Sequence, residues 1–411
     1  MYGGTCINVG CIPSKSLVKN ANLAKLKDRN FEEDREFYRK SVEEKVELIT
    51  MLRGKNYNKL DGIETVDIID GIASFVDNHT VKVVTEDQEY KLEADKIFIN
   101  TCAKSIIPDI EGLKDNPNVY DSEKLMAEYE LPRKLTIVGG GYIGLEFASM
   151  YSSYGSEVTV LDRSEEFLSR EDEDIAQAIK ETLEKKGVKI VLNASTTKVD
   201  GDVLHYTVGD EDITIEGTKV LLATGRKANT DDLNLENAGV EVTDRGLIKV
   251  DDNLKTTADN IWAMGDVCGN QQFTYISLDD YRIVKSALNG GDYDKTKRKN
   301  VPYSVFIDPS FSRVGMNEKE AKKEGIEYKL FKMPTAGVPK AQVLQETEGI
   351  LKVLVDSNTN KILGAMFFSA ESYETINIVK LAMDLDAEYT VLRDMIYTHP
   401  TMSVSINDLL S

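Results

Sequence analysis

The chain has 411 residues, of which 41 % are hydrophobic and 29 % are charged, so it has enough apolar material for folded cores and is not expected to be disordered. Fifty Lys and Arg residues oppose 70 Asp and Glu residues, and the net charge of −20 disfavours nucleic acid and anionic membrane surfaces as partners. No apolar run reaches the ~18 residues that a membrane helix needs, and no secretory signal pattern follows Met1, so we expect a cytoplasmic protein with no membrane partner.

Two of the four cysteines, Cys6 and Cys11, stand close together in GGTCINVGCIPSK. A dithiol at this spacing suits two-electron redox chemistry, but residues five apart on an ideal helix are too distant for a disulfide. The segment is therefore expected to be locally irregular, which Gly10 and Pro13 allow. Lys15 is a nearby cation that would favour a thiolate. With no CxxC pair and only three histidines, we expect no metal site, although a reduced Cys6–Cys11 pair could capture a soft ion.

The rest of the chain predicts alternating α/β segments followed by an α+β region. A charged, helix-like region is expected over 17–60, including the run 30–55, and alternation over 64–100 indicates short strands around a turn at 77–79. An apolar strand at 134–138, a glycine loop, a helix and a strand at 157–162 form a βαβ pattern. Further segments are predicted as helices at 171–187, 317–324, 372–385 and 389–396, and as strands at 188–193, 326–333 and 350–366. Residues 219–226 and 260–268 are each predicted as a strand followed by a turn.

The glycine loop fits GxGxxG in the correct place, between a strand and a helix. Its first glycine would make the tight turn, the second would let the backbone approach a pyrophosphate, and the third would let helix and strand pack closely. Asp162 ends the next strand and can accept from a ribose 2′-OH, which favours NADH. Arg163 would pair with the 2′-phosphate of NADPH or lie in solvent, so some tolerance of NADPH is expected. The predicted loop residues are Gly139, Gly140, Gly141, Tyr142, Ile143 and Gly144.

Several motifs in the same order along the chain resemble those of the class I pyridine nucleotide–disulfide oxidoreductases. These FAD flavoproteins include lipoamide dehydrogenase, glutathione reductase and mercuric reductase. GGTCINVGCIPSK resembles the family's redox-disulfide signature, and GGGYIGLE resembles its NAD(P) loop. ATGRKANT, which contains Gly225, resembles the strand and turn that close the NAD domain. IWAMGDV resembles the FAD segment, and YTHPTM resembles the acid–base motif of the dimerisation domain.

The resemblance implies two nucleotide-binding three-layer α/β domains and a C-terminal α+β dimerisation domain. The FAD domain would comprise residues 1–112 and 234–298, the NAD(P) domain 113–233 and the dimerisation domain 299–411. The family places a strand, a GxGxxG loop and a helix before the GGTC motif, whereas this chain begins just before that motif. We therefore expect an FAD domain that is incomplete at its N-terminus, because Met1 is an internal methionine or because the gene is damaged.

The resemblance also assigns roles to single residues. Electrons would pass from NAD(P)H through FAD to a Cys6–Cys11 disulfide, with Cys11 as the flavin-facing thiolate and Cys6 as the thiol that attacks substrate. Lys15 would lie near the flavin and pair with Glu146. His399 would be the general acid/base, supplied by the partner subunit, so the active enzyme would be a homodimer.

The FAD itself would be held by Gly4, Thr5, Lys15 and Asp266, the last through ribityl hydroxyls. Several positions depart from the family pattern, among them Ala228, which stands where a proline is usual. Cys102 stands where a glycine is common, and Val404 stands where a glutamate usually orients the histidine. A substrate whose leaving group needs little protonation would suffer least from that loss.

The stretches FTYISLDDYRIV and VPYSVFIDPSFSRVGM most resemble the RclA-like branch, which is associated with bacterial defence against reactive chlorine species and hypothiocyanite. This resemblance implies a small oxidant as substrate. Two alternatives stay open. One is a truncated or degenerate, FAD-deficient member that acts as a nucleotide-binding protein, and the other is a dihydrolipoamide dehydrogenase.

Overall fold

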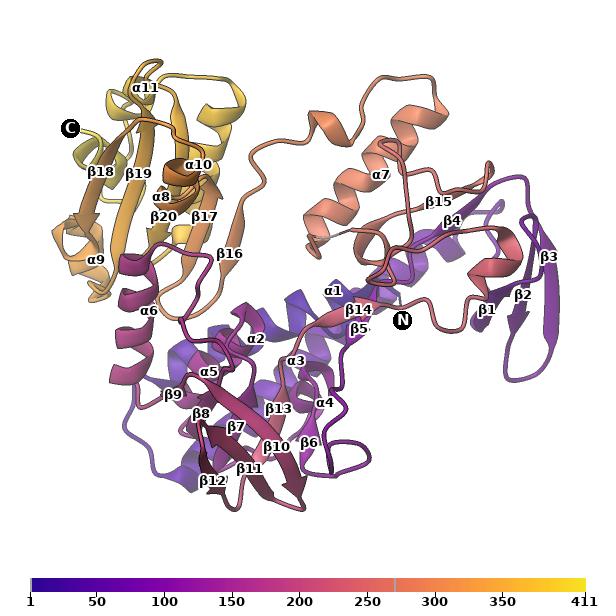
Figure 1. Ribbon diagram of the computed structural model, residues 1–411, viewed down its shortest axis with the longest axis horizontal. Helices are drawn as coiled ribbons and strands as arrows, with labels where there is room; N and C mark the ends of the chain where they lie inside the picture. Colours follow the sequence, from indigo (N-terminus) through magenta and orange to yellow (C-terminus); the bar gives the residue numbers. More distant parts are fainter. Residues whose placement is uncertain (1, 270) are drawn as a thin grey trace. The chain divides into compact units, whose positions relative to one another are not determined.

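The computed structural model describes residues 2–269 and 271–411 and is traced in Figure 1. The chain forms two compact units, which are described separately. The first unit comprises Met1–Ser14, Glu44–Ile106 and Thr224–Arg298, and the second comprises Lys15–Glu43, Ile107–Ala223 and Lys299–Ser411. Helices α2 (Cys11–Ala24) and α3 (Phe31–Asp61) have residues in both units. The division into FAD, NAD(P) and dimerisation domains stays a prediction.

The first unit is built from short strands and connecting turns. Strands β1, β2 and β3 pair antiparallel in that order, β4 pairs parallel with β15, and β5 pairs antiparallel with β14. Its elements are α1 (Gly4–Asn8), β1 (Ile72–Phe75), β2 (Thr80–Val84), β3 (Glu89–Glu93), β4 (Ile97–Ile99), β5 (Ala103–Ser105), β14 (Arg226–Ala228), η1 (Leu235–Ala238), β15 (Ile261–Ala263), η2 (Gly265–Val267), α7 (Thr274–Leu288) and η3 (Lys295–Lys297).

Helix α7 is anchored to the turn η2 by a buried carboxylate. Asp280, which is almost fully buried, accepts a 2.8 Å hydrogen bond from the Gly265 backbone N–H. Arg298 pairs with both Asp279, at 2.6 Å, and Asp280. Because this carboxylate and the buried Ile283 hold the helix on one face, the first turn of α7 is fixed in position.

The second unit contains a parallel sheet with strands in the order β6-β13-β7-β8-β9. The run β7-α5-β8-α6-β9 confirms the predicted βαβ pattern, and the strand order reverses beside β7, where ligands bind in open sheets of this kind. The elements are β6 (Val119–Tyr120), α4 (Ser122–Ala127), β7 (Lys134–Val138), α5 (Tyr142–Ser153), β8 (Glu157–Leu161), α6 (Glu173–Lys185), β9 (Lys189–Val191) and β13 (Lys219–Leu222).

An antiparallel sheet of β10 (Ala194–Asp200), β11 (Val203–Val208) and β12 (Glu211–Ile215) interrupts this parallel arrangement. The sequence analysis did not predict it. Val199, Leu204 and Tyr206 of this sheet are buried in one cluster with Leu222 of β13. The antiparallel sheet therefore shares a hydrophobic core with the parallel one.

The C-terminal part of the second unit is an antiparallel sheet in the order β16-β17-β20-β19-β18 with helices beside it, as the predicted α+β region requires. Its elements are β16 (Tyr303–Val305), β17 (Phe311–Gly315), α8 (Glu318–Lys323), β18 (Tyr328–Pro334), η4 (Thr335–Gly337), α9 (Pro339–Leu344), β19 (Ile350–Asp356), β20 (Ile362–Phe368), α10 (Ser372–Asp384), α11 (Tyr389–Arg393) and α12 (Ser405–Leu409). No helix in the described part of the chain is long and apolar enough to cross a bilayer.

Candidate active site

The glycine loop follows β7 and leads directly into α5, as predicted. Gly139 has φ of 112°, a conformation that side chains disfavour. A Cβ on Gly144 would lie 2.1 Å from the Gly139 carbonyl oxygen, so the close approach of helix and strand requires glycine. A Cβ on Gly141 would meet nothing within 4 Å, which leaves open space beside the backbone at the start of α5.

Asp162, which directly follows β8, lies against this loop. A Cβ on Gly140 would lie 2.4 Å from Asp162 Oδ2, so the loop and the carboxylate touch. Asp162 Oδ1 accepts a 3.0 Å hydrogen bond from the Ser164 N–H, which fixes the carboxylate while leaving it further acceptor capacity. Arg163 is exposed. The juxtaposition of loop and carboxylate that a ribose site needs is therefore present.

Tyr142 of the loop is tied to a buried carboxylate. Its hydroxyl donates to Glu171, which is fully buried. Its ring stacks on the ring of Tyr303, with the two centroids 5.5 Å apart. Tyr303 donates to the same Glu171 oxygen at 2.5 Å, and Arg313 pairs with the other oxygen at 3.3 Å. Burial and the Glu171 charge raise the pKa of Tyr142. Sequence reasoning missed this network, because no local pattern links residues so far apart.

The two cysteines lie on either side of a break between helices. Cys6 is inside α1, and Cys11 is the first residue of α2. Gly10 packs on α1, since a Cβ there would lie 3.0 Å from the Thr5 carbonyl oxygen. The predicted local irregularity is confirmed, and Gly4, with φ of 60°, begins α1 in the left-handed region. That Cys6 and Cys11 form a disulfide stays a prediction.

Cys11 also contacts a residue that the sequence analysis did not single out. Its Sγ lies 3.3 Å from Thr274 Oγ1, at the first residue of α7. The nearest signal was the resemblance of FTYISLDDYRIV to one branch of the family, which marked the segment but not the threonine.

The predicted pairing of Lys15 with Glu146 is confirmed. Lys15 Nζ lies 2.8 Å from Glu146 Oε2, and it also lies 4.5 Å above the centroid of the Phe306 ring. The second oxygen of Glu146 accepts a 2.8 Å hydrogen bond from the Phe306 N–H. One carboxylate thus joins α2, which begins at Cys11, to α5, which follows the nucleotide loop.

Two predicted cofactor-binding residues of the first unit, Asp266 and Gly225, lie next to β15 and β14 respectively. Asp266 lies in η2 directly after β15, and burial raises the pKa of its carboxyl, opposed by the Arg226 charge. Gly225 has φ of 111° and accepts from the Ile106 N–H at 3.0 Å. Cys102 has φ of 63°, so it holds the left-handed conformation of the glycine it replaces. Nothing in the described ranges hydrogen-bonds the Asp266 carboxylate, which suits an acceptor for ligand hydroxyls.

His399 is exposed on the loop between α11 and α12. Among residues 2–269 and 271–411 its imidazole has no hydrogen-bond partner. Val404 is half-buried and directly precedes α12, and its backbone N–H donates to Thr401 Oγ1 at 3.2 Å. The valine therefore supplies no orienting acceptor, as expected.

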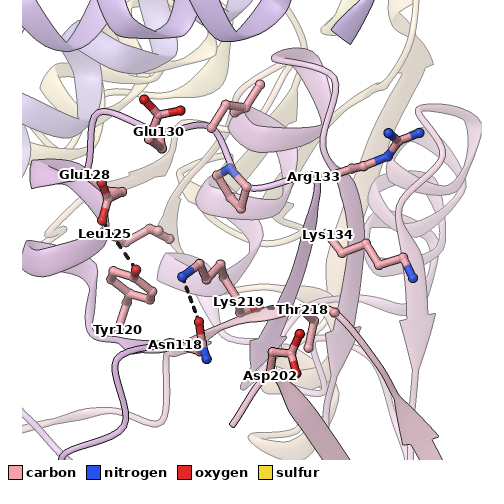
Figure 2. Close-up of a pocket in the computed structure, with 13 residues that line it drawn as sticks. Asn118, Tyr120, Leu125, Glu128, Glu130, Arg133, Lys134, Asp202, Thr218 and Lys219 are labelled. Carbon is pink, nitrogen blue, oxygen red and sulfur yellow. Dashed lines mark hydrogen bonds between the residues drawn. The ribbon is translucent and has the colours of Figure 1, made fainter. Parts of the chain in front are cut away.

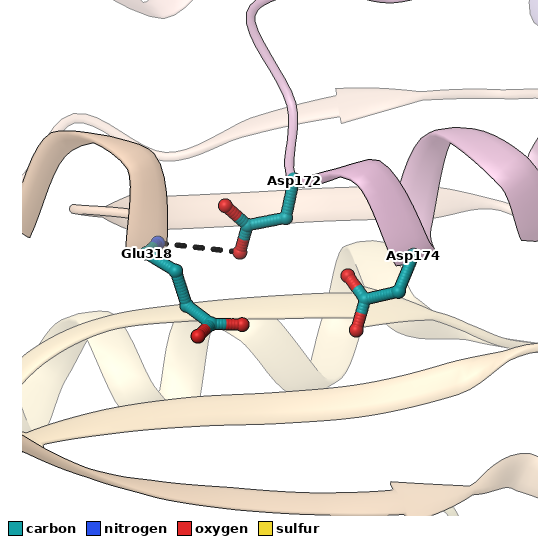
Figure 3. Close-up of side chains that lie close together, drawn as sticks. All are labelled: Asp172, Asp174 and Glu318. Carbon is teal, nitrogen blue, oxygen red and sulfur yellow. Dashed lines mark hydrogen bonds between the residues drawn. The ribbon is translucent and has the colours of Figure 1, made fainter. Parts of the chain in front are cut away.

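A cluster of carboxylates outside this site resembles a metal site at first sight. Asp172, Asp174 and Glu318 have oxygens within 4.8 Å of one another, and Figure 3 shows them converging. The fully buried Lys352 ammonium lies among them, at 2.8, 2.9 and 2.7 Å respectively. Lys332 lies 2.6 Å from Asp174 and Lys322 lies 3.6 Å from Glu318, so three lysines balance the charge of the three carboxylates. The group is therefore an ion-pair network.

A polar cavity of about 400 Å³ lies at the amino ends of the parallel strands (Figure 2). Lys219 in its wall donates to Asn118 at 2.8 Å, and Tyr120 donates to Glu128 at 3.4 Å. The glycine loop follows the carboxyl end of β7, so this cavity is not the nucleotide site.

Comparison with known proteins defines the class of the chain. Residues 1–290 match the model of the pyridine nucleotide-disulphide oxidoreductase family, and residues 301–409 match the family's dimerisation domain. The chain belongs to the pyridine nucleotide-disulphide oxidoreductases. It is an oxidoreductase of the flavoprotein disulfide reductase type, whose members use FAD and a pyridine nucleotide.

Within the family the similarity to one protein is high. The probable pyridine nucleotide-disulfide oxidoreductase RclA of Escherichia coli is 47% identical over 412 residues, with 100% of this chain and 91% of the relative covered. A solved structure of that HOCl-induced flavoprotein disulfide reductase matches with a TM-score of 0.93 at 46% identity, covering 100% of this chain and 91% of the other.

Other relatives are more distant. Dihydrolipoyl dehydrogenase of Geobacillus stearothermophilus is 33% identical, with 97% of this chain and 86% of the relative covered. Mercuric reductase of Bacillus cereus is 34% identical, with 98% and 64% covered. The predicted α/β fold, family and RclA-like branch are confirmed, and neither alternative reading is better supported.

The glycine loop generates a first prediction, which separates binding from folding. Gly141→Ala should leave the free energy of unfolding nearly unchanged, since its φ of −75° suits alanine, but should weaken NADH binding about ten-fold or more by filling the space beside a phosphate. Gly144→Ala should instead lower the free energy of unfolding by about 1–3 kcal/mol through its clash with backbone. Calorimetric binding and urea unfolding test both, and equal effects of the two variants would contradict this assignment.

The carboxylate cluster generates a second prediction. Burial acts to raise the pKa of Asp174 and of Glu318, but hydrogen bonds from lysines outweigh it, and both pKa values lie below their ordinary values. Each therefore adds stability that is present above its unfolded pKa and is lost as pH falls toward its folded pKa. Lys352→Met should cost about 3–5 kcal/mol at neutral pH, and the cost should shrink below about pH 4 as the carboxyls protonate.

Urea unfolding of the parent protein and of Lys352→Met, from neutral pH to below about pH 4, measures the difference in their free energies of unfolding. The control is Lys322→Met, which removes an exposed lysine 3.6 Å from Glu318 and should cost little. A cost for Lys352→Met that did not vary with pH would contradict the electrostatic explanation.

Proposed function

We propose that this chain passes electrons from NADH to a Cys6–Cys11 disulfide and from there to a small oxidant. The observation that carries the proposal is the Lys15–Glu146 ion pair, which joins the helix beginning at Cys11 to the helix that follows the nucleotide loop. FAD, when bound, would supply the two-electron chemistry that links the nicotinamide to the disulfide. Asp266 would accept hydrogen bonds from the ribityl hydroxyls of FAD, and Gly4 and Thr5 would also contact the cofactor.

The dithiol that results would carry the reaction with the oxidant. The Cys6 thiolate attacks the sulfur of hypothiocyanite and releases hydroxide, which leaves as water after taking a proton. The Cys11 thiolate then displaces thiocyanate and closes the disulfide. Two thiols and one hypothiocyanite anion thus give one disulfide, one thiocyanate and one water. Thiocyanate leaves without protonation, so this step tolerates the valine at position 404.

The proposal of a small oxidant is supported by similarity to RclA, which is described as an HOCl-induced flavoprotein disulfide reductase. Hypothiocyanite is the example that the resemblance to the RclA-like branch implies. A complex of that protein with Cu(II) has also been solved, so Cu(II) belongs among the oxidants to be assayed. For the reductant, the contact of Asp162 with the glycine loop supports NADH, because its carboxylate would accept from a 2′-OH and repel a 2′-phosphate. Exposed Arg163 supports some use of NADPH.

We further propose that the enzyme works as a homodimer through residues 299–411. Large apolar side chains are exposed on and beside α10 and α11, with Ile396 96% and Leu385 71% exposed. An exposed apolar group of this kind marks a protein interface. The second subunit would supply His399 as the general acid/base.

The spectrum of the purified protein before and after anaerobic addition of NADH tests the redox path. We expect a flavin spectrum, and on reduction a long-wavelength thiolate band that persists in Cys6→Ser and is lost in Cys11→Ser. NADPH at the same concentration should reduce the protein more slowly. A protein without flavin, or a reduction in which the two cysteine variants behave alike, would overturn the proposal.

The dimer proposal has its own test. Ile396→Asp combined with Leu385→Asp should place charges in an apolar contact and shift the protein to monomers, with loss of oxidant reduction. Sedimentation velocity measures the change in mass. Leu26→Asp serves as the matched control, since Leu26 is 70% exposed outside residues 299–411. Dissociation by the control, or none by the double variant, would refute the assigned interface.

A further inference from the structure

The contact between Cys11 and Thr274 joins two helix starts within the first unit. Cys11 is the first residue of α2, and Thr274 is the first residue of α7. Their Sγ and Oγ1 atoms lie 3.3 Å apart, although 263 positions separate them in the sequence. This distance is within the range of a hydrogen bond to sulfur. When Cys11 is a thiolate, the threonine hydroxyl must be the donor, because a thiolate has no proton.

Both atoms are held in place by their surroundings. The first turn of α7 is closed by bonds from the Ile276 and Ser277 N–H groups to the Phe273 carbonyl, and the helix is anchored through Asp280. On the other side, the Ser14 hydroxyl donates to the Cys11 carbonyl at 3.1 Å, which fixes the first turn of α2. The β-branched threonine has few rotamers, so its hydroxyl stays directed once the helix is placed.

The titratable groups near Cys11 are Cys6, Lys15 and Tyr275, whereas the Thr274 hydroxyl is a neutral hydrogen-bond donor on α7. Cys6 is on α1, and Tyr275 follows Thr274 on α7. Burial raises the pKa of Tyr275, and the Cys11 charge raises it further, so this phenol stays neutral. On its own helix Lys15 is already paired with Glu146. The amino end of α7 adds a positive dipole, which also favours a thiolate.

We propose that Thr274 is a positioning residue that stabilises the Cys11 thiolate by donating its hydroxyl to Sγ. The inference rests on the proposed function, in which Cys11 is the thiolate that receives electrons and later closes the disulfide. Thr274 does not touch substrate; it sets the fraction of Cys11 that is reactive at neutral pH and the direction in which the sulfur points. A hydrogen bond to a charged group favours the charged form.

The test measures the rate at which iodoacetamide alkylates Cys11 in the reduced protein as a function of pH, with the Cys11 peptide quantified by mass spectrometry. Thr274→Val keeps the shape and removes the hydroxyl. We expect the pH midpoint of alkylation to rise and the rate at neutral pH to fall about five-fold, the factor that corresponds to about 1 kcal/mol for one hydrogen bond. The plateau rate at high pH should not change, which shows that access to the sulfur is unaltered.

Two further variants make the result specific. Thr274→Ser restores the hydroxyl and should return the midpoint toward that of the parent protein. Ser286→Ala removes a hydroxyl from the same helix, where it accepts from the Tyr293 N–H at 3.0 Å, and should leave the midpoint unchanged. An unchanged midpoint in Thr274→Val, or an equal shift in Ser286→Ala, would overturn the proposal.

The outcome is distinguishable from failure of the proposed function. Alkylation needs neither flavin nor NADH, so a shifted midpoint together with no reduction of the parent protein by NADH would refute the redox path and leave the role of Thr274 standing. An unchanged midpoint in a protein that NADH reduces normally would refute the role of Thr274 alone.

Discussion

The second unit depends on one carboxylate, that of Glu146. Its two oxygens accept from Lys15 Nζ and from the Phe306 N–H, which lie 131 and 160 positions away in the sequence. Glu146 stands in the second turn of α5, the helix that the glycine loop begins. A single side chain therefore fixes helix α2 and the start of the C-terminal sheet with respect to the glycine loop. An unpaired carboxylate at this depth would be costly, so all three segments must be in place together.

The same strategy recurs wherever segments of the second unit meet. Asp308, which is buried, receives the ammonium groups of Lys25 and Lys186, and these oppose the effect of burial and keep the pKa of the carboxyl below its ordinary value. Lys352 lies among three carboxylates from α6 and α8. Buried ion pairs of this kind add little net stability over apolar contacts, but each tolerates only one arrangement of its partners. In the second unit, the ion pairs of Asp308 and Lys352 fix the position of the C-terminal sheet relative to the parallel sheet.

Much of this architecture could be predicted from the sequence, and the failures have physical causes. Strand β7, helix α5 and strand β8 were predicted within a few residues, because their apolar positions follow a clear period. Helix α7 was missed, because the buried Asp280 occupies a position where an apolar residue would complete the helical pattern. The antiparallel β10–β12 sheet was missed as well. Its strands mix polar and apolar residues without the continuous apolar run of β7, and their assignment depends on pairing that single segments do not reveal.

The site followed a similar division. The glycine loop and the cysteine pair each lie within one segment and were foreseen from their local pattern. The Lys15–Glu146 pairing joins segments 131 positions apart and was foreseen only through the family resemblance. Thr274 beside Cys11 and Glu171 beneath Tyr142 were not foreseen, because each contact joins segments that carry no matching pattern. What the sequence could not supply was the spatial coincidence of residues with individually ordinary surroundings.

The bonds of Tyr142 limit how far this molecule can be treated as a set of exchangeable modules. Its hydroxyl shares Glu171 with Tyr303 of β16 and Arg313 of β17, so a residue of the nucleotide loop is completed by the C-terminal sheet. A nucleotide-binding segment transplanted from another member of the family could replace Tyr142 with a different residue. That residue would then meet Glu171 and Arg313, whose arrangement suits a tyrosine. Changing cofactor preference by grafting would therefore require residues 142, 171, 303 and 313 to travel as one set.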